Sequence, residues 1–320
     1  MNLFPKKKKL INPFLGDSNL KFLFQQDTYE SFYHFLKDPF APHPDPNLFF
    51  LTDNFREVWN SVLQGIIEKK GFILLTGEKG IGKTTLMALV YLYLTTNGRK
   101  VKAIPLFDPP HTIEDLLRVV LRNLGFPAEE ENKSAMLSRL DEDILRRSAE
   151  GETVALILDE AQNLRKEVLE DIRLLANPDP RRPKLLQEIF VGAPQFEKIL
   201  KGRGLWILNQ RFEVRCRLCP FSLEESLAYI EHRLNRVGSS TAKVFTPRAV
   251  YLIVRHARGI PGALNRLCQE ALLVAYTQLK ERSDSADVRE AIAHLEKSWL
   301  GRWRLRGKIR FWLSENSAER

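Results

Sequence analysis

The stretch Gly77–Thr84 reads G-x-x-x-x-G-K-T, and it constrains the fold of this chain more than any other segment. An unbroken apolar run at residues 72–76 precedes it, as expected for a buried parallel strand, and residues 86–94 follow it as an apolar stretch without a helix breaker. Glycines between a strand and a helix can adopt conformations that other residues avoid, so their N–H groups can surround a phosphate. The context predicts a phosphate-binding loop, and an ordinary glycine turn before a helix is the alternative.

The loop pattern also gives expected roles to individual residues. Lys83 is expected to reach the β- and γ-phosphates of a nucleotide, and the Thr84 hydroxyl is expected to bind Mg²⁺. ATP and Mg²⁺ are therefore the predicted ligands. The residues expected to contact the nucleotide are Gly77, Glu78, Lys79, Gly80, Ile81, Gly82, Lys83, Thr84 and Thr85.

A pair of acids completes the predicted site. Residues 154–158 form a second apolar run typical of a buried strand, and Asp159 and Glu160 follow it directly. Asp159 is expected to hold Mg²⁺, directly or through water, and Glu160 is expected to polarise the attacking water as general base. The alternative is a pair of acids at a helix N-terminus, where negative charge is also favourable.

Composition places this chain among ordinary intracellular globular proteins. It has 320 residues, enough for one large or two modest domains, and a formal net charge of +9 that weakly favours a polyanionic partner. Its three cysteines are too few for a disulfide framework and indicate a reducing compartment. Cys216 and Cys219 form a lone C-x-x-C pair, either a zinc or redox site or two half-buried strand residues.

The sequence predicts no transmembrane helix, because it contains no apolar run of about 18 residues or more. The basic N-terminus lacks the sustained apolar core of a signal peptide. We therefore expect a cytoplasmic protein and leave open a peripheral position on the inner membrane.

The remaining chain alternates between strands and helices up to about residue 220 and is helical after it. Further strands are expected over 101–106 and 185–191, and helices over 52–69, 112–124, 132–149 and 167–176. The helix over 52–69 is expected to form a wall of the adenine pocket. A capping box, Ser222 with Glu225, opens the helical part, and helices follow over about 247–257, 261–279 and 284–299. The predicted fold is a three-layer α/β domain with a parallel sheet, followed by a small all-helical lid.

This pattern divides the chain into four parts. Residues 1–36 form a basic and aromatic arm, residues 37–220 the α/β domain, residues 221–298 the lid, and residues 299–320 a basic aromatic tail. The lysines Lys6 to Lys9 either touch phosphates or belong to a solvated tail. The residues 299–320 fit a membrane or protein partner, a nucleic acid strand, or packing on the lid.

Several spaced motifs resemble one known family. They include Pro39-Phe40, the phosphate loop, the run L-D-E-A-Q-N-L at 158–164, Gln210-Arg211, and Gly259-Ile260-Pro261. Over roughly residues 33–296 the chain is similar to AAA+ ATPases of the ExeA/GspA type, component A of general (type II) secretion. It is also similar to the transposition regulators TnsC and TniB, which assemble on DNA.

The resemblance implies an AAA+ core with ATP bound at its junction with a helical lid. It also implies a homo-oligomer, a ring or a filament, that assembles through ATP. Arg211 is expected to reach the γ-phosphate of a neighbouring copy, with Arg215 and Arg217 close enough to substitute. A surface salt bridge is the alternative role of Arg211.

Two positions depart from the pattern of the family. Ala193 stands where the family has a polar sensor side chain, in Gly-Ala-Pro-Gln instead of Gly-Gln-Pro-Glu. Gly262 stands where the family has a lid arginine that contacts the γ-phosphate, and Arg258 or Arg266 could compensate. Since both changes remove γ-phosphate contacts, we expect ATP binding with slow hydrolysis.

Three functions are compatible with these features. The first is an ATPase switch or motor that acts on a secretion-type protein partner at or near a membrane. The second is a DNA-associated ATPase of the transposition-regulator type, which the net charge of +9 favours. The third is a protein in which ATP only holds a conformation, for which Ala193 and Gly262 argue and against which Glu160 argues.

Overall fold

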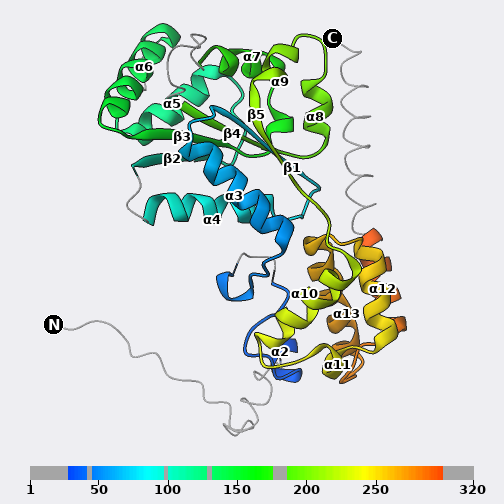
Figure 1. Ribbon diagram of the computed structural model, residues 1–320. Coiled ribbons are helices and arrows are strands. Elements are labelled where there is room, and N and C mark those ends of the chain that lie inside the picture. The colour runs from blue at the N-terminus through cyan, green and yellow to red at the C-terminus, as the bar shows by residue number, and fades with distance from the viewer. Residues whose placement is uncertain (1–27, 42–44, 97–99, 128–131, 176–185, 298–320) are drawn as a thin grey trace, which may run out of the picture.

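The computed structural model describes residues 28–41, 45–96, 100–127, 132–175 and 186–297. The Lys6 to Lys9 arm and the tail at 299–320 lie outside these residues, so their expected contacts stay predictions. Within the described part, an α/β unit with a sheet at its centre adjoins a smaller helical unit (Figure 1).

The described strands form one parallel sheet in the order β2-β3-β4-β1-β5. Their bounds are β1 Phe72–Gly77, β2 Val101–Leu106, β3 Thr153–Leu158, β4 Leu186–Gly192 and β5 Phe212–Leu218. Four of them confirm the expected strands. The sequence of β5 gives a weaker signal, because arginines alternate with apolar residues as in an edge strand with one buried face.

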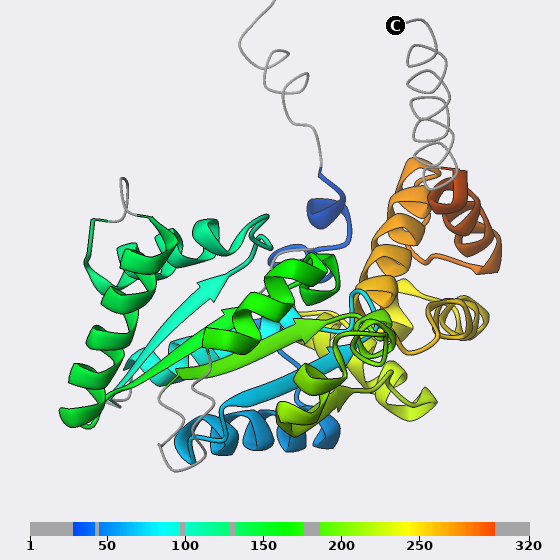
Figure 2. The same cartoon turned by 90° about the horizontal axis from the view of Figure 1, so that it is seen from above.

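Helices cover both faces of the sheet, as Figure 2 shows from above. One face carries α3 (Asp53–Ile67) and α4 (Lys83–Thr96). The other carries α5 (Ile113–Leu124), α6 (Lys133–Ala149), α7 (Lys166–Leu175), α8 (Gln195–Leu200) and α9 (Trp206–Arg211). β1, β3 and β4 are buried along their whole length. This burial explains the mostly apolar sequences of β1 and β3, whereas β4 also buries Gln187 and Glu188.

The helical unit, or lid, contains α10 (Leu223–Asn235), α11 (Thr241–Val244), α12 (Pro247–Ala257) and α13 (Pro261–Thr277), and residues 285–297 are also helical. The capping box that opens α10 is present, since the Ser222 hydroxyl accepts from Glu225 N and the Glu225 carboxylate accepts from Ser222 N. The predicted fold, a three-layer parallel α/β domain followed by an all-helical lid, is confirmed.

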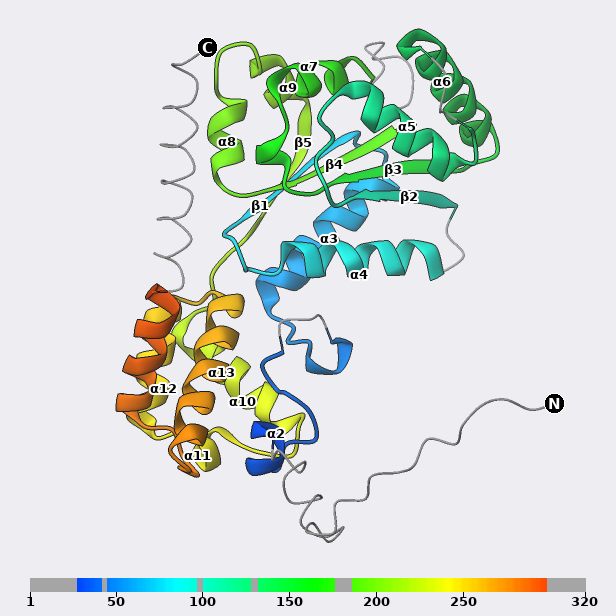
Figure 3. The ribbon, with the colours of Figure 1, turned by 180° about the vertical axis from the view of Figure 1, so that it is seen from behind.

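The segment before α3 packs on the lid and not on the sheet. It contains α2 (Tyr29–Phe32) and a short 3₁₀ helix, η1 (Pro46–Leu48), and its buried side chains between residues 29 and 48 belong to the lid core (Figure 3). The Tyr33 hydroxyl donates to Lys280 O at 2.9 Å. The predicted division gave residues 1–36 to a separate arm and residues 37–220 to the α/β domain. The structure differs from this division, because the described residues between 29 and 48 pack on the lid and bury their apolar rings in its core.

The passage from the sheet into the lid depends on one glycine. Gly259 has φ +73°, in the left-handed region, and its carbonyl accepts a hydrogen bond of 2.9 Å from Phe221 N just after β5. A Cβ atom at Gly259 would come within 2.2 Å of Phe221 O. This position therefore requires glycine for both conformation and space.

We predict that Gly259→Ala lowers the free energy of unfolding by at least about 2 kcal/mol, since strain and a backbone clash add. Urea denaturation followed by circular dichroism measures the change. Gly125→Ala is the matched control, because Gly125 has φ +98° but open space at its Cβ, so only the conformational cost applies. Equal losses for the two variants would contradict the clash.

A buried carboxyl lies in the middle of the sheet. Glu188 of β4 is fully buried, and neither of its carboxyl oxygens has a hydrogen-bond partner. Burial raises the pKa of Glu188 well above its usual value, and the positive charge of Arg211 opposes this with a smaller effect. We infer that the neutral acid is the favoured form of this side chain in the folded protein.

An acid with a raised folded-state pKa stabilises the fold most below its unfolded pKa of about 4.3, and the contribution is lost as pH rises. The unfolding free energy of the wild type should therefore fall relative to Glu188→Gln as pH rises from about 5 to 8, with a slope of at most about 1.4 kcal/mol per pH unit. Urea titrations across this range measure the difference. Glu213→Gln, at an exposed strand position, is the control, and parallel curves for wild type and Glu188→Gln would contradict the prediction.

Candidate functional site

The glycine loop connects the centre of the sheet to α4. Gly77 ends β1 and Lys83 begins α4, while Gly80 and Gly82 have φ of +82° and +110°. Among the described residues, none accepts a hydrogen bond from the backbone N–H of Lys79, Gly80 or Gly82. Backbone donors without a protein acceptor at the start of a helix can form a cradle for an anion.

Lys83 lies inside this cradle. Its side chain is 7% exposed, and its Nζ donates to Gly77 O at 2.9 Å and to Glu78 O at 3.2 Å. Burial lowers the pKa of Lys83, and the nearby carboxylates of Glu160 and Asp159 partly offset this effect. The Lys83 ammonium group could instead donate its hydrogen bonds to an anion bound in the cradle.

The acid pair meets the loop at the carboxyl edge of the sheet. Asp159 follows β3 directly and is buried, and its Oδ2 accepts a hydrogen bond of 2.9 Å from the Thr84 hydroxyl. Its other oxygen accepts from Glu160 N at 2.8 Å. The described residues contain no group of three or more His, Cys, Asp or Glu side chains that could hold a metal ion. A hydroxyl and one carboxylate fit Mg²⁺, which keeps several waters and takes phosphate oxygens as further ligands.

Glu160 itself is held in an unusual conformation, with φ 50° and ψ 38° in the left-handed region. Its carboxylate accepts a hydrogen bond from the Gln162 side-chain amide, and the Gln162 carbonyl oxygen accepts from Ala193 N at 2.9 Å. The sequence gave no role to Gln162. Its place two residues after the acid pair, in the short 3₁₀ helix η2 (Ala161–Asn163), is the signal that could have indicated one.

A cavity of about 310 Å³ opens beside the loop, between the α/β unit and the lid. The lead-in and the first turn of α3 form one wall, the loop with Glu160 forms the second, and the lid forms the third. The lining residues outside the loop include Leu48, Phe49, Phe50, Thr52, Asn54, Phe55, Cys219, Phe221, Tyr229, Arg233, Pro261, Gly262 and Asn265. As expected, the first turn of α3 lines the cavity, but Phe49 and Phe50 had no predicted role there.

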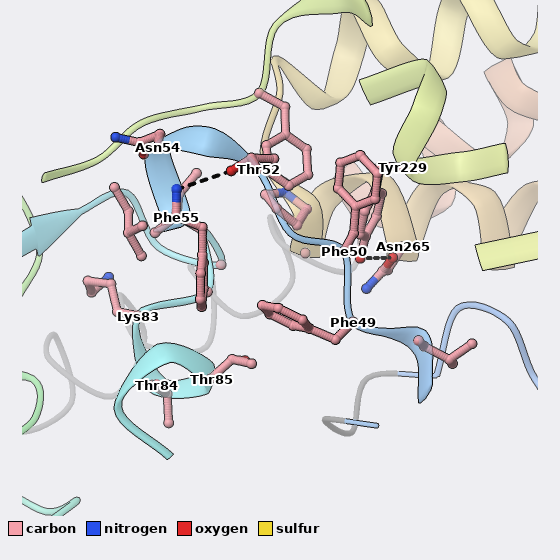
Figure 4. Close-up of a pocket in the computed structure, with 18 of the residues that line it drawn as sticks. Phe49, Phe50, Thr52, Asn54, Phe55, Lys83, Thr84, Thr85, Tyr229 and Asn265 are labelled. Carbon is pink, nitrogen blue, oxygen red and sulfur yellow. Dashed lines mark hydrogen bonds between the residues drawn. The ribbon is translucent and has the colours of Figure 1, made fainter. Parts of the chain in front are cut away.

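Aromatic rings line the apolar part of this cavity. In Figure 4 the rings of Phe49 and Phe55 lie between Lys83 on one side and Tyr229 on the other. Phe49 and Phe55 meet edge to face at 4.9 Å, and the Tyr229 hydroxyl donates to Asn265 at 2.9 Å. A cavity lined by apolar rings and a few polar groups is typical of a ligand-binding site.

The lid contacts the loop through Gly262. Gly262 N donates to Gly80 O at 3.0 Å, and a Cβ at Gly262 would come within 3.1 Å of the same oxygen. The missing side chain therefore allows the start of α13 to approach the loop backbone. Arg266 donates to Gly262 O at 3.4 Å, and Arg258 lines a separate groove on the lid with Tyr251. Neither arginine lines the cavity, so neither takes the position of the absent lid arginine.

Arg211 lies at the opposite edge of the sheet from the loop. It ends α9 just before β5, where its guanidinium donates to Arg173 O at 2.8 Å and lies 5.9 Å from the centre of the Phe72 ring. Phe72 begins β1, whereas Gly77 ends it. Since the strands are parallel, this arginine cannot reach the loop of its own chain. Arg215, which follows nearby in β5, donates to Asn209 at 2.9 Å.

The cysteine pair does not form a site among the described residues. Cys216 is buried in β5, where burial raises the pKa of its thiol to about 11. Cys219 follows the strand and is exposed. Among the described residues, no further His, Cys, Asp or Glu joins the pair in a group that could hold a metal ion. The burial of Cys216 in β5 agrees with the strand interpretation.

Comparisons with known proteins agree with this geometry. Residues 66–200 match a family model described as AAA domain. The chain therefore contains a region that matches the AAA domain family. Over 261 residues it is homologous to general secretion pathway protein A of Aeromonas hydrophila, with 31% identity over 81% of this chain. The chain spans about half of that relative, 47% of its length.

Solved structures share the AAA+ fold. Cdc6p of Pyrobaculum aerophilum has a TM-score of 0.62 at 16% identity, covering 80% of this chain and 70% of its own. The ORC1 protein of Aeropyrum pernix, solved in complex with DNA, has a TM-score of 0.59 at 17% identity, covering 82% and 70%. At these identities the likeness shows the fold alone. Of the helices that the structure describes, none has the length and apolar character needed to cross a membrane.

We predict that Lys83→Ala weakens the binding of Mg²⁺-ATP about 10- to 100-fold, because a buried charged donor is lost. Isothermal titration calorimetry measures the affinity. Lys79→Ala is the matched control, since Lys79 is exposed in the same loop and its backbone N–H is retained. Normal binding by Lys83→Ala would contradict the assignment of the phosphate cradle.

Proposed function

We propose that this chain binds and hydrolyses ATP as an AAA+ switch or motor. One observation carries the proposal: the loop and the acid pair Asp159 and Glu160 meet at the mouth of one cavity, with the Thr84 hydroxyl on Asp159. Phosphoryl transfer needs little covalent chemistry from a protein, so positioning and charge stabilisation suffice.

In this proposal the phosphates lie in the loop. The backbone of residues 77–85 surrounds them, and Lys83 neutralises the β- and γ-phosphates. Thr84 and Asp159 hold Mg²⁺, which would neutralise the charge that develops on the phosphate oxygens. Glu160 orients and polarises the attacking water as general base. The base of the nucleotide packs against the aromatic wall of the cavity, which includes Phe49 and Phe55.

We infer that hydrolysis is completed by a second copy of the chain. Arg211 lies at the opposite sheet edge from its own loop, so it can act only on a neighbour's γ-phosphate in a homo-oligomer. An arginine supplied in this way contributes about 10³ to 10⁵ in rate. Because Ala193 and Gly262 give no polar side chain to the γ-phosphate, we expect slow turnover.

For the partner, we propose a secretion-type or membrane-associated protein. The support is the homology to general secretion pathway protein A, which extends over most of this chain. A DNA-associated ATPase is the second candidate, because the net charge of +9 favours a polyanion. We propose a cytoplasmic location, with a peripheral position on the inner membrane as the alternative.

The proposal of a shared site is tested by mixing two inactive variants. Glu160→Gln loses the base but keeps Arg211, and Arg211→Ala has the reverse defect. We expect each alone to lose about 100-fold or more in ATP turnover, and the mixture to regain activity at about a quarter of its interfaces. A phosphate-release assay measures turnover, and Arg215→Ala is the neighbouring control.

The mixture is measured across protein concentrations, with and without duplex DNA. Activity that appears on mixing and rises with concentration supports catalysis between copies. A mixture that stays inactive, while the wild type turns over, would contradict the role of Arg211. Recovery that requires DNA and weakens steeply with salt would favour the DNA-associated function. Tight ATP binding with no wild-type turnover would mean that ATP only holds a conformation.

A further inference from the structure

The side chain of Gln162 connects the acid Glu160 to the end of β4. Its amide Nε2 donates to the Glu160 carboxylate, and its Oε1 accepts from Ala193 N at 2.9 Å. Within the side-chain amide of Gln162, only the oxygen can accept a hydrogen bond from a backbone N–H, and only the nitrogen can donate one to a carboxylate. The two neighbours therefore fix which way the amide points.

The residues around the Gln162 side chain pack closely against it. A Cβ at Gly192, the last residue of β4, would come within 3.1 Å of Gln162 Oε1 and 3.2 Å of the Phe196 Cβ. The backbone around Gln162 is held by η2, in which Asn163 N donates to Glu160 O at 2.8 Å. Gln162 is thus held between two strand ends, β3 through Glu160 and β4 through Ala193.

Ala193 occupies the position at which this chain lacks a polar side chain. Its backbone N–H nevertheless donates a hydrogen bond to Gln162, and the Gln162 side chain in turn donates to Glu160, the proposed general base. The end of β4 therefore keeps a polar link to Glu160 without a polar residue at position 193.

We propose that Gln162 is a positioning residue that orients Glu160 and couples it to the end of β4, in place of a side chain at position 193. This inference rests on the proposed function, in which Glu160 is the base. A donor on one carboxylate oxygen fixes the orientation of the group and leaves the other oxygen for the attacking water. Lys83 and Asp159 are charged groups near Glu160: the Glu160 carboxylate interacts with the Lys83 ammonium through its charge, and Asp159 Oδ1 accepts from Glu160 N at 2.8 Å.

Two substitutions separate orientation from simple packing. Gln162→Leu keeps the volume and removes both hydrogen bonds, while Gln162→Glu keeps the acceptor for Ala193 N and places a second carboxylate beside Glu160. We expect kcat to fall about 10- to 100-fold in both variants, because a general base contributes a rate factor of about 10² to 10⁴ and only part of it depends on orientation. The Kd for ATP should stay within about twofold of the wild-type value. Gln64→Leu is the matched control, since Gln64 donates to Glu68 at 2.6 Å on the exposed face of α3.

A rescue and a direct measurement complete the test. Ala193→Gln supplies a polar side chain at position 193, so it should raise kcat by a larger factor in the Gln162→Leu background than in the wild type. Hydrogen exchange at the Ala193 amide should accelerate in Gln162→Leu and not in Gln64→Leu. Wild-type kcat and exchange in Gln162→Leu would overturn this inference alone. A wild type without turnover would overturn the proposed function together with it.

Discussion

The turn between β1 and α4 is the constraint on which the rest of the structure depends. β1 is buried along its length in the middle of the sheet, so the loop that follows it emerges at the carboxyl edge, beside the end of β3. Parallel strands bring their ends together at one edge, and there the Thr84 hydroxyl meets Asp159. In the loop, which lines the cavity, no described residue accepts from the backbone N–H of Lys79, Gly80 or Gly82, so these donors can bind an anion.

The lid is attached to this site from two directions. The lead-in packs its aromatic rings into the lid core before α3 begins, and the chain returns to the lid through Phe221 and Gly259 after β5. Between these attachments, Gly262 brings the start of α13 to the loop. A ligand in the cavity would therefore contact the sheet, the lead-in and the lid at once, which is how binding could change the angle between the two units.

The two departures from the family pattern have different structural consequences. At Gly262 the lost side chain is replaced by close backbone contact, because a Cβ would meet Gly80 O. At Ala193 the backbone N–H donates to the side-chain oxygen of Gln162, and the side-chain nitrogen of Gln162 donates to Glu160. At both positions the resemblance implies a polar side chain directed at a phosphate, and this chain instead makes a backbone contact between elements that surround the site.

The sequence alone determined the strands β1 to β4, the lid helices and the two halves of the candidate site, because burial on both faces and helix capping act locally. Tertiary structure decided the rest. The lead-in joined the lid because its rings found apolar area there, and Phe49 and Phe50 entered the cavity through that docking. The pairing of Gln162 with Ala193, and the burial of Glu188 near Arg211, depend on which strands become neighbours. Strand order is a property of the whole sheet, so no local pattern encodes these contacts.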